Sequence, residues 1–116
     1  MLTKTPFRIG SYQINPLENT VVNQEQTNSL QPKFIEVLVF LASQYPSIVT
    51  REQIINAVWD GNGYVGEKAL TNAIWHLRKT LVDKPTQQEY IETIRKTGYR
   101  LLYQPHYQKL ETPPAE

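Results

Sequence analysis

Short apolar runs, each ended by residues that favour turns, occupy the chain from Phe7 to Leu30. Glycine, asparagine and proline lie at the breaks, where they supply a positive φ, a fixed φ or local side-chain hydrogen bonds. The pattern predicts four short strands in an antiparallel meander, over residues 7–9, 12–14, 20–22 and 27–30. Because so small a sheet is not stable alone, we expect its apolar side to pack on another layer. That side is predicted to carry Phe7, Ile9, Tyr12, Ile14 and Val22.

Apolar residues recur every three or four positions in three later segments, which is the period of an α-helix. The first helix is predicted over 32–44, with a proline at its first position, where no backbone hydrogen bond is lost. The second begins at Thr50, which has Gln53 three residues later in the spacing of a capping box, and ends at the glycine-rich segment 60–63. The third is predicted over 67–81. The core stripes of the first and third helices are Phe34, Val37, Leu38 and Leu41, and Leu70, Ile74, Leu77 and Leu81.

A β-hairpin is predicted near the end of the chain, where extended segments at 90–94 and 99–103 are separated by a basic turn. Gly98 in this turn is expected to supply a positive φ. The segment 104–116 contains three prolines and little to bury, so we interpret it as a flexible linker. The 116 residues are therefore predicted to form one α+β domain over 1–103, followed by this linker.

The formal net charge of +1 conceals an uneven distribution along the chain. Residues 1–66 hold four Lys/Arg and five Asp/Glu, whereas residues 67–100 hold seven and four, a local excess of +3. A basic segment of this kind is typical of nucleic-acid binding, but it is also what an ordinary solvated surface contains. Nucleic-acid binding and an ordinary solvated surface are distinguished by where these charges lie on the predicted elements.

The side of the third helix that faces away from its apolar stripe carries hydrogen-bonding and cationic residues. They are Lys68, Thr71, Asn72, Trp75, His76, Arg78 and Lys79. An α-helix fits the major groove of B-DNA, where asparagine pairs with adenine, long cations reach phosphates or guanine, and apolar side chains touch a thymine methyl. A solvated polar helix face is the alternative. An exposed tryptophan and the scarcity of acids on this side favour DNA.

The turn of the predicted hairpin carries Arg95 and Lys96. A basic turn that projects from a sheet can reach a phosphate or enter a narrow minor groove. Charged residues on edge strands also deter aggregation, so the turn alone does not decide between the two roles.

Other classes of function lack the residues that they need. The chain has no cysteine, which excludes disulfides, thiolate nucleophiles and cysteine-ligated zinc. Its two histidines, His76 and His106, belong to no metal-binding or acid–base motif, so we expect no enzyme activity, no cofactor and no metal site. The longest apolar run, Val37 to Ala42, is far too short to cross a bilayer. The N-terminus lacks the layout of a signal peptide, so this domain is expected in the cytoplasm.

Four segments resemble the successive signatures of the OmpR/PhoB-type winged helix-turn-helix family. They are Leu30–Phe34, Thr50–Ile54, Leu77–Leu81 and Ile94–Leu101. The similarity extends from about Phe7 to Tyr103, which is most of the chain. Within the family, Tyr90–Thr93 and the short Asp83–Pro85 connection are most similar to the ToxR and CadC branch. In that branch the domain is the cytoplasmic N-terminal part of a regulator anchored in the inner membrane by one span.

The resemblance implies a winged helix-turn-helix fold with an N-terminal four-stranded antiparallel sheet, three helices and a C-terminal β-hairpin wing. It also implies that the chain is part of a bacterial transcription regulator that binds double-stranded promoter DNA at specific sequences. The helix at 67–81 would read the major groove, and the wing at 94–100 would contact the minor groove or the backbone.

The family pattern also implies roles for individual positions of this sequence. Base or nearby backbone contacts fall at Asn72, Trp75 and His76; phosphate contacts fall at Thr71, Arg78 and Thr93; the wing arginine is Arg95. Lys68, Lys79, Lys96 and Tyr99 complete the predicted DNA-binding set. His76 stands where a long cation is common, and Trp75 is bulkier than many relatives carry, so the family's base preference does not transfer to this chain.

Further partners are expected as well. The segment 60–66 resembles the loop that contacts RNA polymerase in some members, and a dimer on DNA is expected. The proline-bearing tail leads us to expect that residues beyond 116 carry a membrane anchor and a sensory domain in the full-length protein. A protein-interaction module on a winged-helix scaffold is the alternative function. Tyr12, Tyr64, Trp75 and Tyr103 could anchor such an interface.

Overall fold

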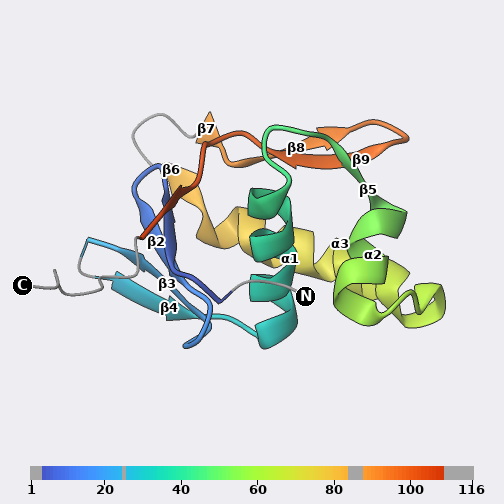
Figure 1. The fold of residues 1–116 in the computed structure, drawn as a ribbon, viewed down its shortest axis with the longest axis horizontal. Coiled ribbons are helices and arrows are strands. Elements are labelled where there is room, and N and C mark those ends of the chain that lie inside the picture. Colours follow the sequence, from blue (N-terminus) through green and yellow to red (C-terminus); the bar gives the residue numbers. More distant parts are fainter. Residues whose placement is uncertain (1–3, 25, 84–87, 109–116) are drawn as a thin grey trace, which may run out of the picture.

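The computed structural model describes residues 4–24, 26–83 and 88–108. Within these residues the chain forms three helices and a set of short strands (Figure 1). The helices are α1 (Pro32–Ser43), α2 (Arg51–Trp59) and α3 (Gly63–Thr80). The strands are β1 (Phe7–Ile9), β2 (Tyr12–Asn15), β3 (Thr20–Asn23), β4 (Gln26–Ser29), β5 (Val49–Thr50), β6 (Val82–Asp83), β7 (Gln88–Glu89), β8 (Ile91–Ile94), β9 (Gly98–Leu101) and β10 (His106–Tyr107).

The N-terminal strands form the predicted antiparallel meander, in the order β1-β2-β3-β4. Its apolar side is confirmed at Phe7, Ile9 and Ile14, which are fully buried. The prediction was wrong at β3, where Val21 is buried and Val22 is partly exposed. Val21 lies directly opposite Ile14 in the register, and residues that face each other across antiparallel strands point to the same side of the sheet.

A fifth strand, which the sequence did not predict, extends this sheet. β10 pairs with the free edge of β1, with Tyr107 opposite Phe7 and a distance of 5.3 Å between the centres of their rings. The backbone N–H of Gln108 also donates to the carbonyl oxygen of Pro6 (3.0 Å). Residues 106–107 belong to the segment interpreted as a linker, and positions 109–116 of that segment lie outside the described residues.

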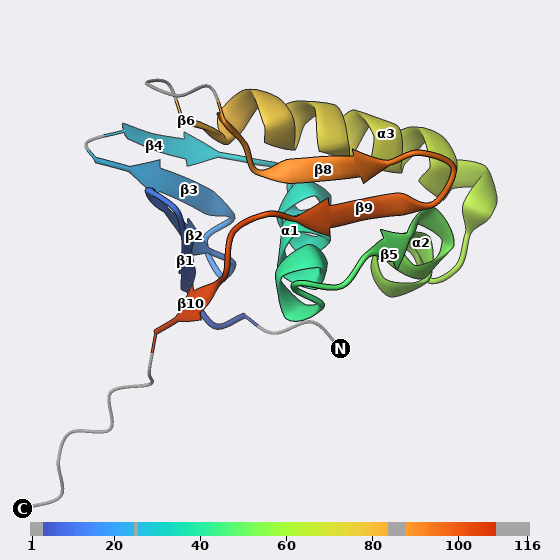
Figure 2. The same cartoon turned by 90° about the horizontal axis from the view of Figure 1, so that it is seen from above.

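The three helices enclose the core beside this sheet. α1 lies between the sheet and α2, and α3 packs across both helices (Figures 1 and 2). The predicted stripes are confirmed, because Val37, Leu38 and Leu41 of α1 meet Leu70 and Leu77 of α3 in one cluster, each at most 1% exposed.

The capping box predicted at the start of α2 is confirmed by reciprocal bonds, in which Gln53 N donates to Thr50 Oγ1 (3.0 Å) and Thr50 N donates to Gln53 Oε1 (2.8 Å).

The connection between α2 and α3 is shorter than predicted. α3 begins at Gly63, four residues before the predicted start, and its first turn is capped by Asn62 Oδ1, which accepts from Val65 N (3.3 Å). Gly66 lies inside α3 and faces α2. A side chain is not tolerated at this position, because an added Cβ would come 2.6 Å from Ile55 Cγ2. This glycine therefore lets α2 and α3 pack closely.

The predicted hairpin is present as β8 and β9, and β5 adds to its β9 edge. We call residues 91–101 the wing. Its turn differs from the prediction, since Lys96 and not Gly98 adopts the positive φ, at 62°. Gly98 is required for space, because a Cβ there would lie 1.8 Å from the backbone oxygen of Val49 on the neighbouring strand.

Candidate nucleic-acid interface

The outer side of α3 presents a ridge of four side chains, which we call the outer ridge. Lys68, Asn72, Trp75 and Lys79 follow one another at spacings of four, three and four residues, so they share one side of the helix. All four are exposed, and the buried residues of α3 lie on the opposite side. The predicted polar ridge is therefore available to a ligand.

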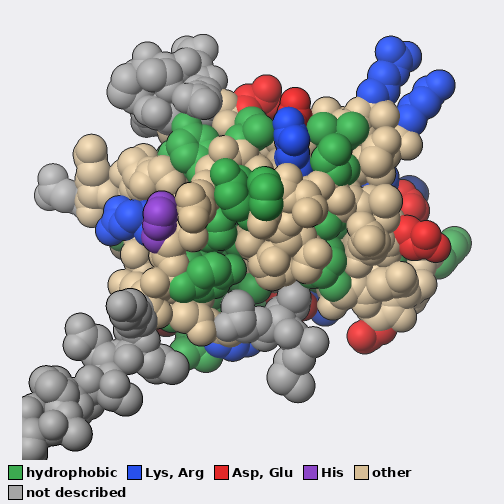
Figure 3. All heavy atoms as spheres, turned by 45° about the horizontal axis from the view of Figure 1, so that its top comes forward, with side chains coloured by type: hydrophobic (Ala, Val, Ile, Leu, Met, Phe, Trp, Pro, Cys, Tyr) green, Lys and Arg blue, Asp and Glu red, His purple; other side chains and the backbone are tan. Residues whose placement is uncertain are grey.

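The basic residues of this half of the chain divide into paired and unpaired cations. Arg78 and Arg100 form ion pairs with Glu89 and Glu92. Within the described residues, Lys68, Lys79, Arg95 and Lys96 have no acidic partner. Among the described basic residues of this half of the chain, the unpaired positive charge thus lies on the outer ridge and on the turn of the wing. Figure 3 shows Lys and Arg side chains projecting from the corner of the molecule where the wing turns.

Three of the predicted DNA-binding residues, Arg78, Thr93 and Tyr99, make contacts within the protein that join the wing to α3. Arg78 donates to the carbonyl oxygen of Ile91 (3.0 Å) and to the hydroxyl of Thr93 on β8. Tyr99 on β9 is only 8% exposed, and the guanidinium of Arg78 lies 6.0 Å from the centre of its ring. The polar atoms of Arg78, Thr93 and Tyr99 are therefore largely committed within the protein, although Thr93 remains exposed.

His76, another predicted contact residue, packs partly against α1. Its imidazole stacks on the ring of Phe34 in α1, with 4.9 Å between ring centres and 19° between planes. The residue is half-buried, because it sits on the side of α3 that faces α1 and not at the centre of the outer ridge. Packing against α1 accounts for an imidazole at this position.

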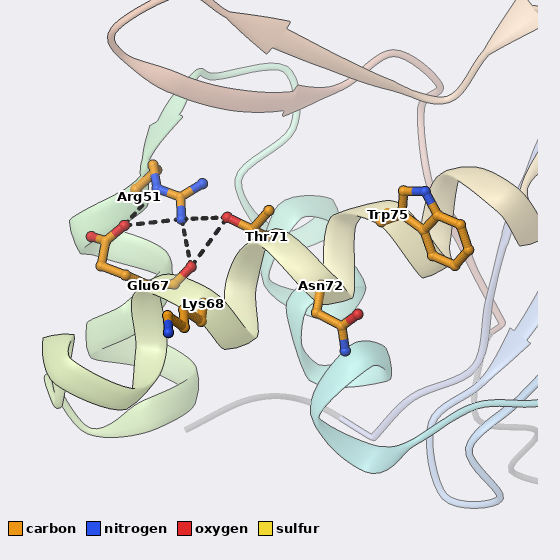
Figure 4. Close-up of a pocket in the computed structure, with 6 residues that line it drawn as sticks. All are labelled: Arg51, Glu67, Lys68, Thr71, Asn72 and Trp75. Carbon is orange, nitrogen blue, oxygen red and sulfur yellow. Dashed lines mark hydrogen bonds and ion pairs between the residues drawn. The ribbon is translucent and has the colours of Figure 1, made fainter.

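Arg51, at the start of α2, is the residue that the sequence analysis missed. Its guanidinium donates to Tyr99 Oη (2.7 Å). It also donates to the backbone oxygen of Glu67 (2.8 Å) and to Thr71 Oγ1 (3.0 Å), and it pairs with the Glu67 carboxylate at 2.9 Å (Figure 4). One side chain thus joins α2, α3 and β9. Nothing in the local sequence distinguishes Arg51 from a solvated cation in the first turn of a helix.

Arg51 also marks where the two predicted surfaces meet. One shallow hollow on α3 is lined by Arg51, Glu67, Lys68, Thr71, Asn72 and Trp75. A second hollow, at the base of the wing, is lined by Thr50, Arg51, Glu52, Thr93, Ile94, Lys96, Thr97, Gly98 and Tyr99. The wing extends in roughly the same direction as α3 (Figures 1 and 2), and Arg51 bonds to both, at Tyr99 and at Thr71. The outer ridge and the basic turn therefore adjoin each other across Arg51.

Removal of Arg51 is expected to loosen this junction. Arg51→Ala leaves the backbone oxygen of Glu67 and the hydroxyls of Thr71 and Tyr99 without their charged donor, and hydrogen bonds to charged groups contribute about 1.5–3 kcal/mol. Thermal unfolding should show that the free energy of unfolding falls by about 2 kcal/mol. The ion pair with Glu67 adds little to this figure, because it is partly exposed to solvent. Lys33→Ala, which removes a cation that bonds a carbonyl elsewhere, serves as the comparison. Equal stability of Arg51→Ala and the parent chain would contradict the role assigned to Arg51.

No group of three or more His, Cys, Asp or Glu side chains in the described part of the chain is arranged to hold a metal ion. No helix among residues 4–24, 26–83 and 88–108 is both long and apolar enough to cross a bilayer.

Comparison with known proteins shows which family the chain belongs to. The model of the family described as "Transcriptional regulatory protein, C terminal" matches residues 24–101, which include all three helices and the wing. The chain belongs to this family. The OmpR/PhoB-type resemblance of the sequence is thereby confirmed.

Curated relatives of this family member include two activators from the predicted branch. The chain is 31% identical over 96 residues to the transcriptional activator CadC of Escherichia coli, covering 82% of this chain and 19% of CadC. It is 30% identical over 95 residues to the cholera toxin transcriptional activator of Vibrio cholerae, covering 78% of this chain and 32% of the activator. The chain spans less than half the length of these relatives.

Solved structures of family members share the fold. The DNA-binding domain of Escherichia coli CadC superposes with a TM-score of 0.76 at 27% identity, covering 93% of this chain and all of that one. The DNA-binding domain of RstA from Klebsiella pneumoniae, solved in complex with the RstA box, gives a TM-score of 0.66 at 28% identity, covering 83% and 95% of the two chains. These likenesses confirm the predicted α+β winged-helix architecture.

Proposed function

We propose that this chain is the DNA-binding part of a bacterial transcription regulator, and that it binds double-stranded DNA at specific sequences. α3 would enter the major groove, with Lys68, Thr71, Asn72, Trp75 and Lys79 toward the DNA, and the wing would place Arg95 and Lys96 on the neighbouring minor groove or backbone. The observation that carries the proposal is that two of the unpaired cations, Lys68 and Lys96, line two hollows that share Arg51. Family membership and the RstA complex support it.

We propose different roles within the predicted set of contact residues, according to the bonds that they make inside the protein. The polar atoms of Arg78, Tyr99 and, in part, Thr93 bond within the protein, so we propose that they position the wing. Thr93 keeps an exposed side and remains a candidate phosphate contact, as does Thr71 beside Arg51. His76 packs on Phe34 and lies at the border of the contact surface.

Selection of bound fragments from a bacterial genome, followed by gel-shift titration against selected and scrambled duplexes, tests the proposal. Asn72→Ala should reduce the preference for selected over scrambled DNA by about tenfold, because a bidentate contact to a base contributes about 1–3 kcal/mol of discrimination. Affinity for scrambled DNA should change little, since that affinity comes from phosphate contacts.

Asn28→Ala is the matched control for Asn72→Ala. Asn28 is an exposed asparagine on β4, at the outer edge of the sheet, and its removal should leave the preference unchanged. Equal losses on both duplexes for Asn72→Ala would remove the base-reading role from α3.

A protein-interaction module on the same fold is distinguished by salt. With about five phosphate contacts, log affinity should fall against log salt with a slope near −4 to −5. An interface led by aromatic side chains would respond only weakly to salt. The unpaired cations on the outer ridge and the wing favour DNA.

For RNA polymerase we propose a contact through residues 60–66. The segment is a short turn followed by the first turn of α3, and it projects Tyr64, which is 95% exposed, and Val65, which is 50% exposed. Tyr64→Ala is expected to keep its affinity for DNA and to lose activation in transcription reconstituted with purified polymerase. Unchanged activation would exclude this surface.

We also propose that the natural protein is longer, sits in pairs on DNA and is anchored in the inner membrane. The greater length of the matched relatives supports a longer protein, and the resemblance to the ToxR and CadC branch supports the anchor. Sequencing of the gene downstream of codon 116 for an apolar stretch of about 20 residues tests the anchor. The mass of the complex with one selected duplex tests the pairing.

A further inference from the structure

Trp75 is the large apolar side chain of the outer ridge. It is 56% exposed, whereas the other large apolar residues in the later turns of α3, Leu70, Ile74 and Leu77, are buried in the core. Its neighbours on the ridge are Asn72 and Lys79, and it also lines the hollow that Asn72 and Lys68 share (Figure 4). An exposed indole at this place offers an apolar surface where the rest of the ridge is polar.

The indole is held in position by its neighbours. The ammonium of Lys79 lies 4.9 Å from the centre of the Trp75 ring, within the range of a cation–π contact. The imidazole of His76 meets the indole edge to face at 4.8 Å and stacks in turn on Phe34, which is 5% exposed. This chain of rings links the exposed indole to the core. Contacts of this kind reduce the conformational freedom that a side chain loses when it binds.

The indole also keeps its polar group available. Within the described residues, no oxygen or nitrogen accepts a hydrogen bond from Trp75 Nε1, and the recorded contacts of this side chain are those with Lys79 and His76. Tryptophan can only donate at this atom. Trp75 thus presents one donor beside an apolar ring, both fixed on the helix proposed to enter the major groove.

Among the four bases, thymine matches this combination in the major groove. Thymine presents the O4 acceptor next to the C5 methyl group. Cytosine presents a donor, guanine presents acceptors without a methyl group, and adenine presents one acceptor and one donor. Resting on the proposed function, we propose that Trp75 reads thymine, with its ring on the C5 methyl group and its N–H directed to O4. The bound sequences should then contain an invariant thymine under the middle of α3.

Replacement of thymine by deoxyuridine tests the proposal on the unaltered protein. Deoxyuridine keeps O4 and loses only the methyl group. Each thymine of a selected duplex is replaced in turn, and affinity is measured by gel shift. At one position of the site the replacement should weaken binding about fourfold, the effect of one methyl group removed from an apolar contact.

Variants of Trp75 assign that loss to the indole. Trp75→Ala should bind the thymine and deoxyuridine duplexes equally. Trp75→Phe, which keeps an aromatic ring and lacks the N–H, should retain a preference for thymine. Leu17→Ala, which removes an apolar residue that is 74% exposed in the turn between β2 and β3, should keep the full fourfold ratio.

The possible failures are distinguishable. If the protein prefers selected over scrambled DNA but tolerates deoxyuridine at every position, the reading of thymine is wrong and the proposed function stands. If Trp75→Ala keeps the fourfold ratio, another residue reads the methyl group. If no duplex is preferred at all, the proposed function itself fails. Should Trp75→Ala not fold, as judged by circular dichroism, the parent chain and Trp75→Phe still decide the question.

Discussion

Gly98→Ala should destabilise the domain by about 3 kcal/mol or more, among the largest effects of any single methyl group in this chain. The added Cβ would lie 1.8 Å from the backbone oxygen of Val49 and 2.8 Å from the Cα of Thr50. Both are backbone atoms, so no side-chain rotation relieves the clash, and β5 would have to separate from β9. The midpoint of thermal unfolding, followed by circular dichroism, should fall by about 10 to 20 °C.

Gly63→Ala is the matched control for Gly98→Ala. Nothing lies within 4 Å of a Cβ added at Gly63, which opens α3 with a negative φ. Alanine is preferred over glycine in a helix by about 1 kcal/mol, so this variant should be as stable as the parent chain or slightly more stable. If Gly98→Ala unfolds at the same temperature as Gly63→Ala, β5 and β9 can move apart at little cost in stability.

Removal of both charges from the wing turn should weaken DNA binding about 60-fold at about 0.1 M salt. Each phosphate contact lowers the slope of log affinity against log salt by about 0.9, and two such contacts amount to this factor at that salt concentration. The double variant Arg95→Gln and Lys96→Asn is suitable, because asparagine tolerates the positive φ at position 96. Gel-shift titrations at several salt concentrations should give a slope that is smaller by about 2.

The control for the wing variant removes the same charge elsewhere. Lys4 and Arg8 are exposed, have no acidic partner among the described residues, and lie on or next to β1, which belongs to the N-terminal sheet. Replacing both with glutamine should change the salt slope much less. If both double variants lose affinity equally, net charge and not the position of the wing would determine binding.

The order and nature of the elements could be read from the sequence because their signals are local. The stripe of α1 and the capping box of α2 involve residues three or four positions apart, and the structure confirms both. The start of α3 was misplaced because Gly63 and Gly66 are typical of a loop. Gly66 in fact serves the contact with Ile55, which depends on how two helices pack.

The parts of the site that the sequence could not predict depend on contacts between distant segments. Arg51 donates a hydrogen bond to Tyr99, which is 48 positions away. The sequence around either residue does not indicate that the two are in contact. The same holds for β10, whose pairing with β1 joins the two ends of the domain. For this reason, prediction could name the exposed residues of the outer ridge but could not separate them from the residues that hold the wing.

The clamp formed by Arg51 has a consequence for redesign. On α3, Glu67, Thr71 and Arg78 maintain the geometry of the wing, whereas Lys68, Asn72 and Lys79 form no hydrogen bond or ion pair with another described side chain. New operator preferences could therefore be installed by exchanging ridge side chains while the scaffold under them stays intact. On α3, the exchangeable side chains of the outer ridge are rotated by about a quarter turn around the helix axis from the side chains that hold the wing.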